Sequence, residues 1–582
     1  MRSLLLCCLA TIIVSAAPQV RTLNDRLTPR EYATLQDWQR RASYLREHIF
    51  ASAGLLPMPD KTPLRAQIFD ERRHGDYAVS KVFFESLPGF YVTGNLYRPT
   101  ASGPFPAILS PHGHWAYGRL ENTDITSIPG RAINLARQGF VVFSYDMIGY
   151  NDSRQLTHDF GGPREKLWGL SLAGLQLWNS IRSVDFLESL PDVDRNRIAA
   201  TGESGGGTQT FLLAGIDDRI KVAAPVNMIS LHMQGGCLCE NQPGLRLDTN
   251  NVELAALIAP RPLLMVSATG DWTNETLQVE FPAMRRIYGL FGEERRVEAV
   301  QFRAPHNYNR DSREAVYAWM ARWLQNAPAE ARVAERPFTP DRPGDLLVFE
   351  GRSLPDGALT ASQLTDNWMA SARRQIDASS PEGLRPALLH ALALERRPPA
   401  RTAAKAASSP AVVLASERQD VQAALARAGF VVRAVRHTPF DAEAAAKIQH
   451  FDTYNRTAAS QRVADIVQTL DANPGAMLVA DGADGAPALL ALAVIGVPRA
   501  VIDVARFDRD SDEAFLERLF IPGIRRAGDL QTAIALAEGP VVIHNAGDRF
   551  RVARGGARVE PGALTPEQIA AALAGDRAGR RR

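Results

Sequence analysis

A Gly-x-Ser-x-Gly turn, set directly between an apolar strand and a helix, restricts the fold of this chain more than any other feature. The strand is predicted over 197–201, the turn runs from Gly202 through Ser204 to Gly206, and the helix is predicted over 208–214. Such a turn lifts a serine hydroxyl out of the edge of a sheet, and glycines flank it because side chains there would collide with neighbouring elements. The order therefore predicts an α/β fold with an exposed serine.

An aspartate and a histidine follow two later predicted strands. The strand over 262–268 leads into Asp271, and the strand over 297–302 leads into His306. Open α/β sheets place their chemistry at the carboxyl ends of the strands, so these side chains are expected to converge on Ser204. A serine hydroxyl needs a base, and the base needs an orienting acid. The order serine, acid, histidine is that of the α/β-hydrolases and predicts a catalytic triad.

Other assignments stay open at this point. Asp248 and Glu240 are alternative acids, because some relatives of this fold take the acid from an earlier strand. Asp271 alone would suit a turn, and Ser204 alone would suit a helix N-cap. A non-catalytic binding protein is a further hypothesis, and it predicts that a fluorophosphonate probe leaves Ser204 unlabelled.

The oxyanion formed in such a reaction needs backbone N–H donors. A predicted inner strand over 105–110 ends in a His-Gly loop of the kind that supplies one donor in lipases and esterases. The loop donor is left open among Gly113, His114 and Trp115, and Gly205 is expected to supply the second. Each donor is worth about 3 kcal/mol of transition-state stabilisation.

The pair His112-x-His114 also fits a different protein, a metal-dependent hydrolase with two imidazole ligands. The side chains that could complete such a site are Asp146, His158 and His232. No His-Glu-x-x-His helix supports this alternative. We therefore expect a serine enzyme that uses neither a metal nor another cofactor, and inhibition by an organophosphate but not by a chelator.

Residues 1–17 are typical of a secretory signal peptide. Arg2 is the charged start, Leu4–Val14 is the apolar stretch, and small residues close the segment. It is too short to span a bilayer, which takes about 20 apolar residues. The sequence thus predicts a secreted or periplasmic protein with no membrane span.

Removal of this segment would leave Cys237 and Cys239 as the only cysteines in the sequence. A Cys-x-Cys pair could form a disulfide, bind a soft metal or remain as two thiols. A disulfide would close a strained ring, because only one residue separates the cysteines. We expect the pair to have a structural role near the site.

At 582 residues the chain is longer than one ordinary domain, and its 45% apolar residues are enough for large cores. We predict a catalytic domain over 21–328, a proline- and arginine-rich linker over 329–345, and a second, non-catalytic α/β domain over 346–578. The net charge of +2 gives no reason to expect a nucleic acid partner.

The second domain resembles a degenerate copy of the first. Residues 425–432 match 135–142 closely, and a predicted strand over 477–480 precedes the glycine-containing turn 481–485. Aligning the two turns puts Asp484 or Ala483 in the place of the serine, and neither carries a hydroxyl. A later strand ends in a Gly-Asp pair, but no histidine follows it. We predict a hydrolase-like sheet without chemistry, with an unrelated Rossmann-like domain as the alternative.

The first domain resembles secreted bacterial α/β-hydrolases of the acetyl xylan esterase type. The residues that carry the resemblance are Pro111-His112-Gly113-His114, Gly202-Glu203-Ser204-Gly205-Gly206-Gly207, Gly270-Asp271 and Pro305-His306. It implies that Ser204 attacks an ester carbonyl, that His306 moves the proton and that Asp271 orients His306. It also implies an acylated carbohydrate or small ester as substrate, with acetyl groups on plant polysaccharide as the expected class.

Two related enzyme classes give different expectations. Glucuronoyl esterases share the fold but carry an arginine directly after the nucleophile, where this chain has Gly205. Prolyl oligopeptidase-like peptidases share the triad order and are the alternative function. They usually carry an N-terminal propeller, for which the residues ahead of the first predicted hairpin leave little room.

Overall fold

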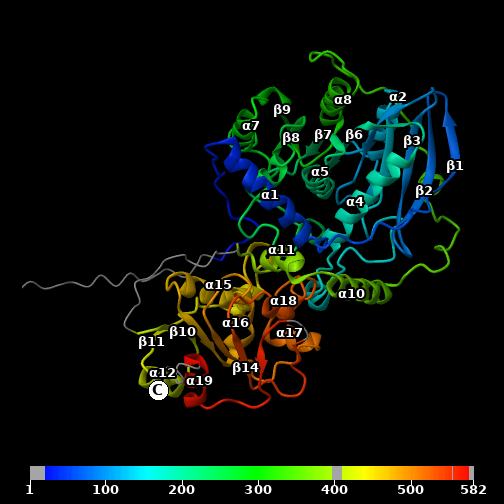
Figure 1. Cartoon of the computed structure of the whole chain (residues 1–582). Coiled ribbons are helices and arrows are strands. Elements are labelled where there is room, and N and C mark those ends of the chain that lie inside the picture. Colours follow the sequence, from blue (N-terminus) through cyan, green and yellow to red (C-terminus); the bar gives the residue numbers. More distant parts are fainter. Residues whose placement is uncertain (1–19, 396–408, 553–554, 576–582) are drawn as a thin grey trace, which may run out of the picture.

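The computed structural model describes residues 20–395, 409–552 and 555–575, so the predicted signal peptide 1–17 lies outside the described residues. Within them the chain forms two α/β regions, each built around its own sheet (Figure 1). Neighbouring strands of the first sheet lie in the order β1-β2-β3-β5-β4-β6-β7-β8-β9. The pairs β1–β2, β2–β3 and β3–β5 are antiparallel, and the other neighbouring pairs are parallel.

The strands of the first sheet are β1 (Gln67–His74), β2 (Tyr77–Leu87), β3 (Phe90–Pro99), β4 (Phe105–Leu109), β5 (Val141–Tyr145), β6 (Val193–Glu203), β7 (Ile220–Val226), β8 (Leu263–Gly270) and β9 (Val297–Pro305). The α-helices of this region are α1 (Leu35–Ser52), α2 (Ile128–Arg137), α3 (Pro163–Leu167), α4 (Leu172–Ser189), α5 (Gly205–Ile216), α6 (Asn251–Ala256), α7 (Glu280–Leu290) and α8 (Arg310–Leu324). Short 3₁₀ turns lie at Gly118–Leu120, Leu238–Glu240 and Glu294–Arg296.

Helices cover both faces of this sheet, which is why its central strands are apolar throughout rather than alternating. In β4, Ala107 and Leu109 belong to the buried cluster that includes side chains of α1, α4, α5 and α7, whereas Ile108 belongs to the buried cluster that includes side chains of α2 and α8. The predicted first hairpin is confirmed as β2 and β3. This arrangement leaves the carboxyl ends of β4, β6, β8 and β9 at one edge.

The apolar spacing from Lys166 to Ser189 predicts one long helix, and this prediction is wrong at its start. The helix is interrupted between α3 and α4, where Gly169 has a φ of +68°. The Ser171 hydroxyl accepts a hydrogen bond from the Gly174 N–H and so caps α4. Gly169 also lies directly against Gly54, where a Cβ would lie 1.8 Å from the Gly169 carbonyl oxygen, so Gly54 has no room for a side chain.

The second sheet is parallel throughout, in the order β11-β10-β12-β13-β14-β15. Its strands are β10 (Ala411–Ala415), β11 (Val431–Ala434), β12 (Met477–Ala480), β13 (Ala500–Asp503), β14 (Val541–His544) and β15 (Arg558–Val559). Its helices are α12 (Gln419–Arg427), α13 (Ala442–Ala446), α14 (Phe451–Tyr454), α15 (Ala458–Asp471), α16 (Gly485–Ala491), α17 (Asp512–Arg518), α18 (Asp529–Ala535) and α19 (Pro566–Ala574), with a 3₁₀ turn at Gly482–Asp484.

This order repeats that of the six parallel strands of the first sheet, β5-β4-β6-β7-β8-β9. The Rossmann order 3-2-1-4-5-6 is different, since there the chain continues outward twice before it crosses back. The second sheet therefore shares the strand order of the first, an order that flavodoxin-like doubly wound sheets also have. A degenerate hydrolase copy stays a prediction.

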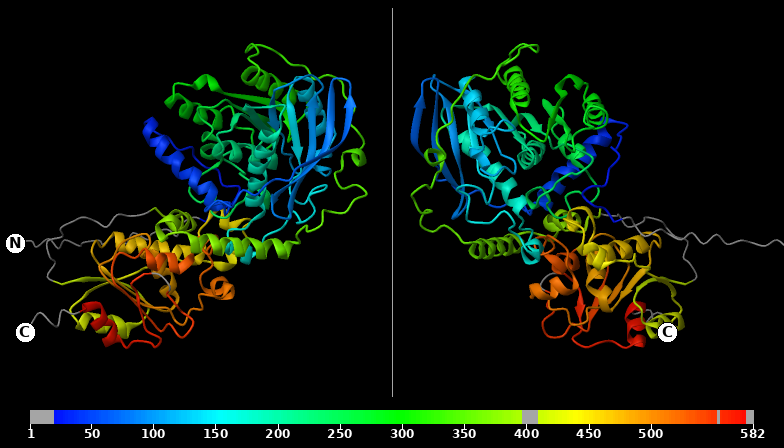
Figure 2. Two further views of the ribbon diagram at one scale, coloured as in Figure 1. Left: turned by 45° about the vertical axis from the view of Figure 1, so that its right-hand side comes forward. Right: turned by 180° about the vertical axis from the view of Figure 1, so that it is seen from behind.

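Two helices that follow the predicted linker lie between the regions, α10 (Ala361–Ala378) and α11 (Pro381–Leu392) (Figure 2). Trp368 of α10 donates its indole N–H to the Trp168 carbonyl of the first region at 2.9 Å. The preceding segment, with α9 (Pro343–Leu346), also packs on the first region, where Asn95 donates to the Leu346 carbonyl and Leu359 to the Gly89 carbonyl. Buried apolar side chains of both regions thus form one continuous cluster.

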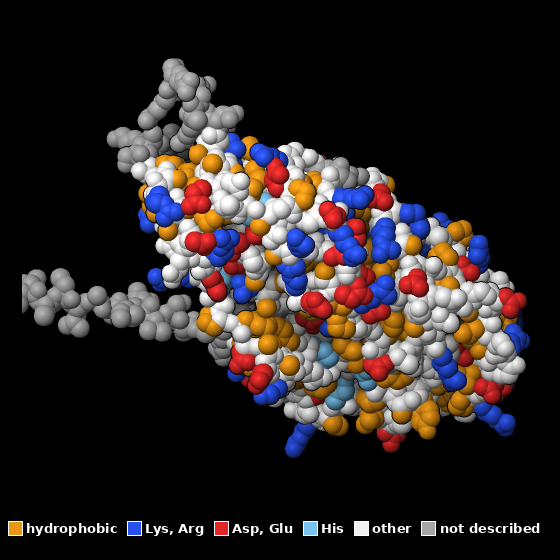
Figure 3. Space-filling model, turned by 90° about the horizontal axis from the view of Figure 1, so that it is seen from below, with side chains coloured by type: hydrophobic (Ala, Val, Ile, Leu, Met, Phe, Trp, Pro, Cys, Tyr) orange, Lys and Arg blue, Asp and Glu red, His pale blue; other side chains and the backbone are white. Residues whose placement is uncertain are grey.

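The described surface carries charges of both signs. Figure 3 shows acidic and basic side chains interspersed over one face of the molecule. Among the residues that the structure describes, no helix combines the length and the apolar character that crossing a membrane requires.

Candidate active site

Ser204 occupies the turn between β6 and α5 in a conformation that L-residues rarely adopt. Its φ and ψ are 56° and −123°, and its N–H donates to the Val226 carbonyl at 3.1 Å. A Cβ on Gly202 or on Gly206 would lie 2.4 or 2.5 Å from the Pro111 carbonyl oxygen. The predicted elbow is therefore present, and its glycines are needed because the loop after β4 presses against them.

His306 and Asp271 form an ion pair at the ends of β9 and β8. The Nδ1 atom of His306 lies 2.8 Å from Oδ2 of Asp271, whose side chain is 2% exposed. The other oxygen of Asp271 accepts from the Thr273 N–H at 2.7 Å. The Nε2 atom of His306 is buried and has no hydrogen-bond partner among the described residues. This is the arrangement that a triad needs, since the acid fixes one ring nitrogen and leaves the other for a hydroxyl.

The two alternative acids are engaged elsewhere. Asp248 pairs with Arg41 at 3.1 Å. One Glu240 oxygen accepts from the N–H groups of Gly236 and Cys237 at 2.9 and 3.0 Å. The geometry thus selects Asp271 as the partner of His306.

The loop after β4 contacts both Ser204 and His306. A Cβ built on Gly113 would lie 3.0 Å from Cβ of Ser204 and 3.2 Å from the indole nitrogen of Trp115. The Trp115 ring stacks on His306 with centroids 6.1 Å apart, and Trp272 packs on the same imidazole at 4.4 Å. The predicted triad residues and the predicted oxyanion loop therefore lie together at one edge of the sheet.

Hydrogen bonding within this loop narrows the choice of oxyanion donor. The Trp115 N–H donates to the Gly113 carbonyl at 3.0 Å, and the Gly113 N–H lies 3.5 Å from Oε1 of Glu203. The N–H groups of His114 and Gly205 have no acceptor among the described residues, and the His114 ring lies 2.7 Å from the position of a Cβ on Gly205. The geometry favours the His114 and Gly205 pair, because Trp115 donates its backbone N–H to Gly113 and its indole N–H to Glu203.

The structure adds one element that the sequence prediction missed, a buried carboxylate inside the Gly-x-Ser motif. Glu203 is fully buried and pairs with Arg131 of α2 at 2.8 Å. It also accepts from the indole N–H of Trp115 at 2.7 Å. Glu203 therefore ties the loop after β4 to the elbow. The motif itself names the position, but nothing in the sequence shows that Arg131 reaches it.

The metal-hydrolase alternative requires His112, and His112 is fully engaged by the backbone. Its Nδ1 atom donates to the Gly113 carbonyl at 2.7 Å, and its Nε2 atom accepts from the Met147 N–H at 3.0 Å. Burial lowers the pKa of His112 to about 3, so the ring is neutral. Asp146 pairs with Arg119 in the interior. The proposed ligand set is therefore wrong at these two positions.

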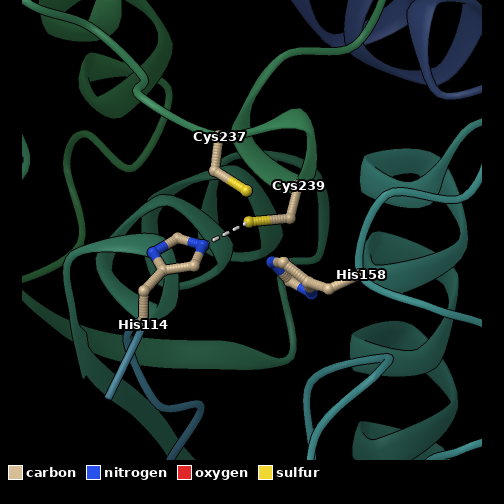
Figure 4. A group of neighbouring side chains, drawn as sticks. All are labelled: His114, His158, Cys237 and Cys239. Carbon is tan, nitrogen blue, oxygen red and sulfur yellow. Dashed lines mark hydrogen bonds between the residues drawn. The ribbon is translucent and has the colours of Figure 1, made fainter. Parts of the chain in front are cut away.

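His114 and His158, however, meet the two cysteines beside the elbow. Figure 4 shows the four side chains of His114, His158, Cys237 and Cys239 turned toward a common centre. The Nε2 atom of His114 lies 2.9 Å from Sγ of Cys239, and both cysteines are free thiols. The sequence placed this pair near the site but gave no signal that the two histidines join it.

Comparison with known proteins agrees with this geometry. The model of the acetyl xylan esterase (AXE1) family matches residues 69–230, which include the loop after β4 and the elbow. The solved structure of methylesterase BT1017 is 31% identical, has a TM-score of 0.50, and the match covers 60% of this chain and 78% of that chain.

Two further relatives share less of the sequence. The protein named hydrolase YtaP in Bacillus subtilis (strain 168) is 26% identical over 250 residues, which are 39% of this chain and 80% of that protein. An acetyl xylan esterase from Paenibacillus sp. R4 is 17% identical with a TM-score of 0.34, over 52% of this chain and 98% of that chain. The first region carries the family's fold and the matched motifs. The chain belongs to the acetyl xylan esterase (AXE1) family of α/β-hydrolases.

Proposed function

We propose that this protein is a serine esterase that removes acyl groups from carbohydrate, with Ser204 as nucleophile, His306 as general base and Asp271 as the orienting acid. The observation that carries the proposal is the His306–Asp271 pair at 2.8 Å, which leaves a buried, unpartnered Nε2 atom. The loop after β4 links this imidazole to Ser204, because Trp115 of the loop stacks on His306 and Gly113 of the loop lies against Ser204.

The reaction follows the acyl-enzyme route. The Ser204 hydroxyl attacks the ester carbonyl carbon while Nε2 of His306 takes its proton, and Asp271 stabilises the imidazolium that forms. The N–H groups of Gly205 and His114 donate to the resulting oxyanion. Collapse breaks the ester bond and His306 returns the proton to the leaving alcohol. Water then enters, loses a proton to His306 and releases the acid.

Acetyl groups on plant polysaccharide are the first substrate class, because the family model that matches the chain is that of acetyl xylan esterases. Methyl esters are a second candidate, because the 31% identical solved relative is named a methylesterase. The two reactions leave different small products, acetate in the first case and methanol in the second. In both, the same serine would attack.

The test is a product assay on matched polymers. Acetylated xylan and methyl-esterified pectin are incubated with the protein, with acetate and methanol measured, and a proline-containing peptide amide serves as the peptidase arm. Acetate release without amide cleavage supports the first proposal, and methanol release alone supports the second. Amide cleavage without ester cleavage would contradict both. A polymeric substrate outside the cell would also fit the secretory segment predicted at 1–17, which fractionation of the producing cells tests.

A further inference from the structure

Four potential metal ligands from three separate loops converge beside Ser204. His114 follows β4, His158 lies in the loop after β5, and Cys237 and Cys239 flank the start of the 3₁₀ turn Leu238–Glu240. One ligand atom from each side chain lies within 4.8 Å of every other. Around a tetrahedral zinc ion such atoms stand roughly 3.3–3.8 Å apart, as the usual Zn–S and Zn–N bond lengths require. Small side-chain adjustments would close that difference, because the four side chains already face one another (Figure 4).

His158 is already set to bind through one nitrogen. Its Nδ1 atom donates to the Ile148 carbonyl at 2.6 Å, so Nε2 carries the free lone pair. That Nε2 atom is buried and has no hydrogen-bond partner among the described residues. Histidines that ligate metals generally donate their other ring N–H to a carbonyl or carboxylate in this way. A buried acceptor without a hydrogen-bond partner destabilises the folded protein, and a metal ion shared with the two thiols would remove that penalty.

The loop that carries the cysteines is held from both regions of the molecule. The Glu240 carboxylate accepts hydrogen bonds from the backbone N–H groups of Gly236 and Cys237, and these bonds fix the backbone that carries the two cysteines. From the second region, the Tyr454 hydroxyl donates to Asn241 at 3.0 Å, and the Gln449 amide donates to the Gly236 carbonyl at 3.3 Å. The cysteines are therefore presented by a supported loop, and the second region takes part in that support.

We propose that His114, His158, Cys237 and Cys239 bind one zinc ion in a closed, tetrahedral site. Two thiolates and two imidazoles are a donor set that suits zinc and excludes magnesium or calcium, which take oxygen ligands. Four protein ligands leave no open position, so the ion is structural. The two thiol protons go to solvent on binding.

The site would fix the loop that holds the oxyanion donor. His114 is a ligand through its side chain, and its ring lies against Gly205 of the elbow. A bound ion would join this loop to the loops of His158 and of the cysteines. This consequence for catalysis rests on the proposed function, but the binding of zinc does not.

The experiment measures metal on the full-length protein, purified under reducing conditions without chelator. We expect about one zinc ion per chain by elemental analysis, as for a four-ligand site. Replacing zinc by Co²⁺ is expected to give thiolate-to-cobalt charge-transfer absorption and the visible bands of tetrahedral cobalt. The double variant Cys237→Ser/Cys239→Ser should lose the charge-transfer absorption, and His158→Gln should weaken metal binding at least about tenfold. His232→Gln, an exposed histidine of a neighbouring loop outside the cluster, is the matched control and should bind like the wild type.

Reduced wild-type protein that contains no zinc and gives no thiolate–cobalt absorption on titration would overturn the proposal. Equal metal binding by His158→Gln and the wild type would overturn the ligand set, even if the double cysteine variant does not fold. Metal content and ester hydrolysis separate the two proposals. A zinc-loaded protein without esterase activity leaves the metal site standing, and an active enzyme without zinc leaves only the proposed function.

Discussion

The two sheets of this molecule share a strand order but differ at the turn after the third parallel strand. In the first sheet that turn holds Ser204 at a φ of +56°. In the second sheet β12 ends at Ala480, and α16 begins at Gly485. Asp484, directly before α16, has an ordinary helical conformation with φ −95° and ψ −10°. It is bound by His437 at 2.9 Å and by Arg462 at 2.7 Å.

The difference separates what a sheet provides from what a site needs. Both sheets bring their strand ends to one edge, and both have a histidine beside an aspartate there. Among the described residues, only the first sheet combines such a pair with a hydroxyl in a strained turn and a loop, the one after β4, that presses on that turn. In the second sheet, Asp484 of the equivalent turn forms ion pairs with His437 and Arg462. The residues that link β12 to α16 include no hydroxyl side chain. Chemistry in this fold therefore depends on loops, and the sheet alone does not supply it.

The largest effect is expected from Ser204→Ala. Removal of the nucleophile should lower kcat on an acetyl ester by about 10⁶-fold, as for other serine hydrolases. The matched change in the second sheet, Asp484→Ala, should leave kcat unchanged. Steady-state kinetics on both variants, with thermal unfolding to verify that each is folded, checks the comparison. Residual activity of Ser204→Ala near the wild-type level would move the chemistry elsewhere.

The next largest effect is expected from Asp271→Asn. The amide cannot hold His306 in the tautomer that accepts a proton from serine, so kcat should fall by about 10⁴-fold with a smaller change in KM. Asp248→Asn alters the competing acid, which the structure places on Arg41. If that control loses as much activity as Asp271→Asn, the triad is assigned wrongly.

A smaller effect, on stability, is expected from Glu203→Gln. Arg131 would then be buried without its charge partner, and loss of one member of a buried pair costs about 3 kcal/mol of unfolding free energy. The control is Glu560→Gln in the second region, whose partner Arg558 is 72% exposed. That surface pair should be worth less than about 1 kcal/mol. Chemical denaturation of both variants measures the contrast, and equal losses would contradict it.

The smallest effect is expected from His437→Gln, through pH. The carboxylates of Asp465 and Asp484, which lie 3.5 and 2.9 Å from the ring nitrogens, raise the pKa of His437 to about 9. A raised histidine pKa adds stability that is complete below the unfolded value of about 6.5 and disappears as the pH rises through the folded value. Arg462 also faces this group, since it pairs with Asp484 at 2.7 Å. The difference in Tm between wild type and variant should therefore be largest at pH 6 and vanish above pH 9. A difference that grows with pH would refute the ion-pair assignment.

Much of the candidate site could be predicted from the sequence, because its residues follow recognisable strands. Apolar runs place Ser204, Asp271 and His306 at strand ends, and parallel sheets gather strand ends at one edge. The same reasoning anticipates strands of the second sheet at 411–415 and 477–480, which the structure has as β10 and β12. The local sequence pattern was sufficient to predict the position of a residue that directly follows a single strand.

The rest depends on long-range contacts that no local pattern encodes. The loops 147–165 and 229–251 have no hydrophobic period, so nothing in them indicates that His158 meets the cysteines. The buried pair of Glu203 and Arg131 joins β6 to α2 across 72 residues of sequence. The interruption before α4 was missed because the apolar spacing does not change there. The helix nevertheless restarts at Leu172, where the Ser171 side chain caps it.

Labelling with a fluorophosphonate probe, followed by peptide mapping, tests the central claim most directly. The account predicts one adduct per chain, on Ser204, and its loss in His306→Ala while Asp484→Ala still labels fully. An adduct on another residue, or ester hydrolysis that continues while Ser204 stays unmodified at saturating probe, would contradict it.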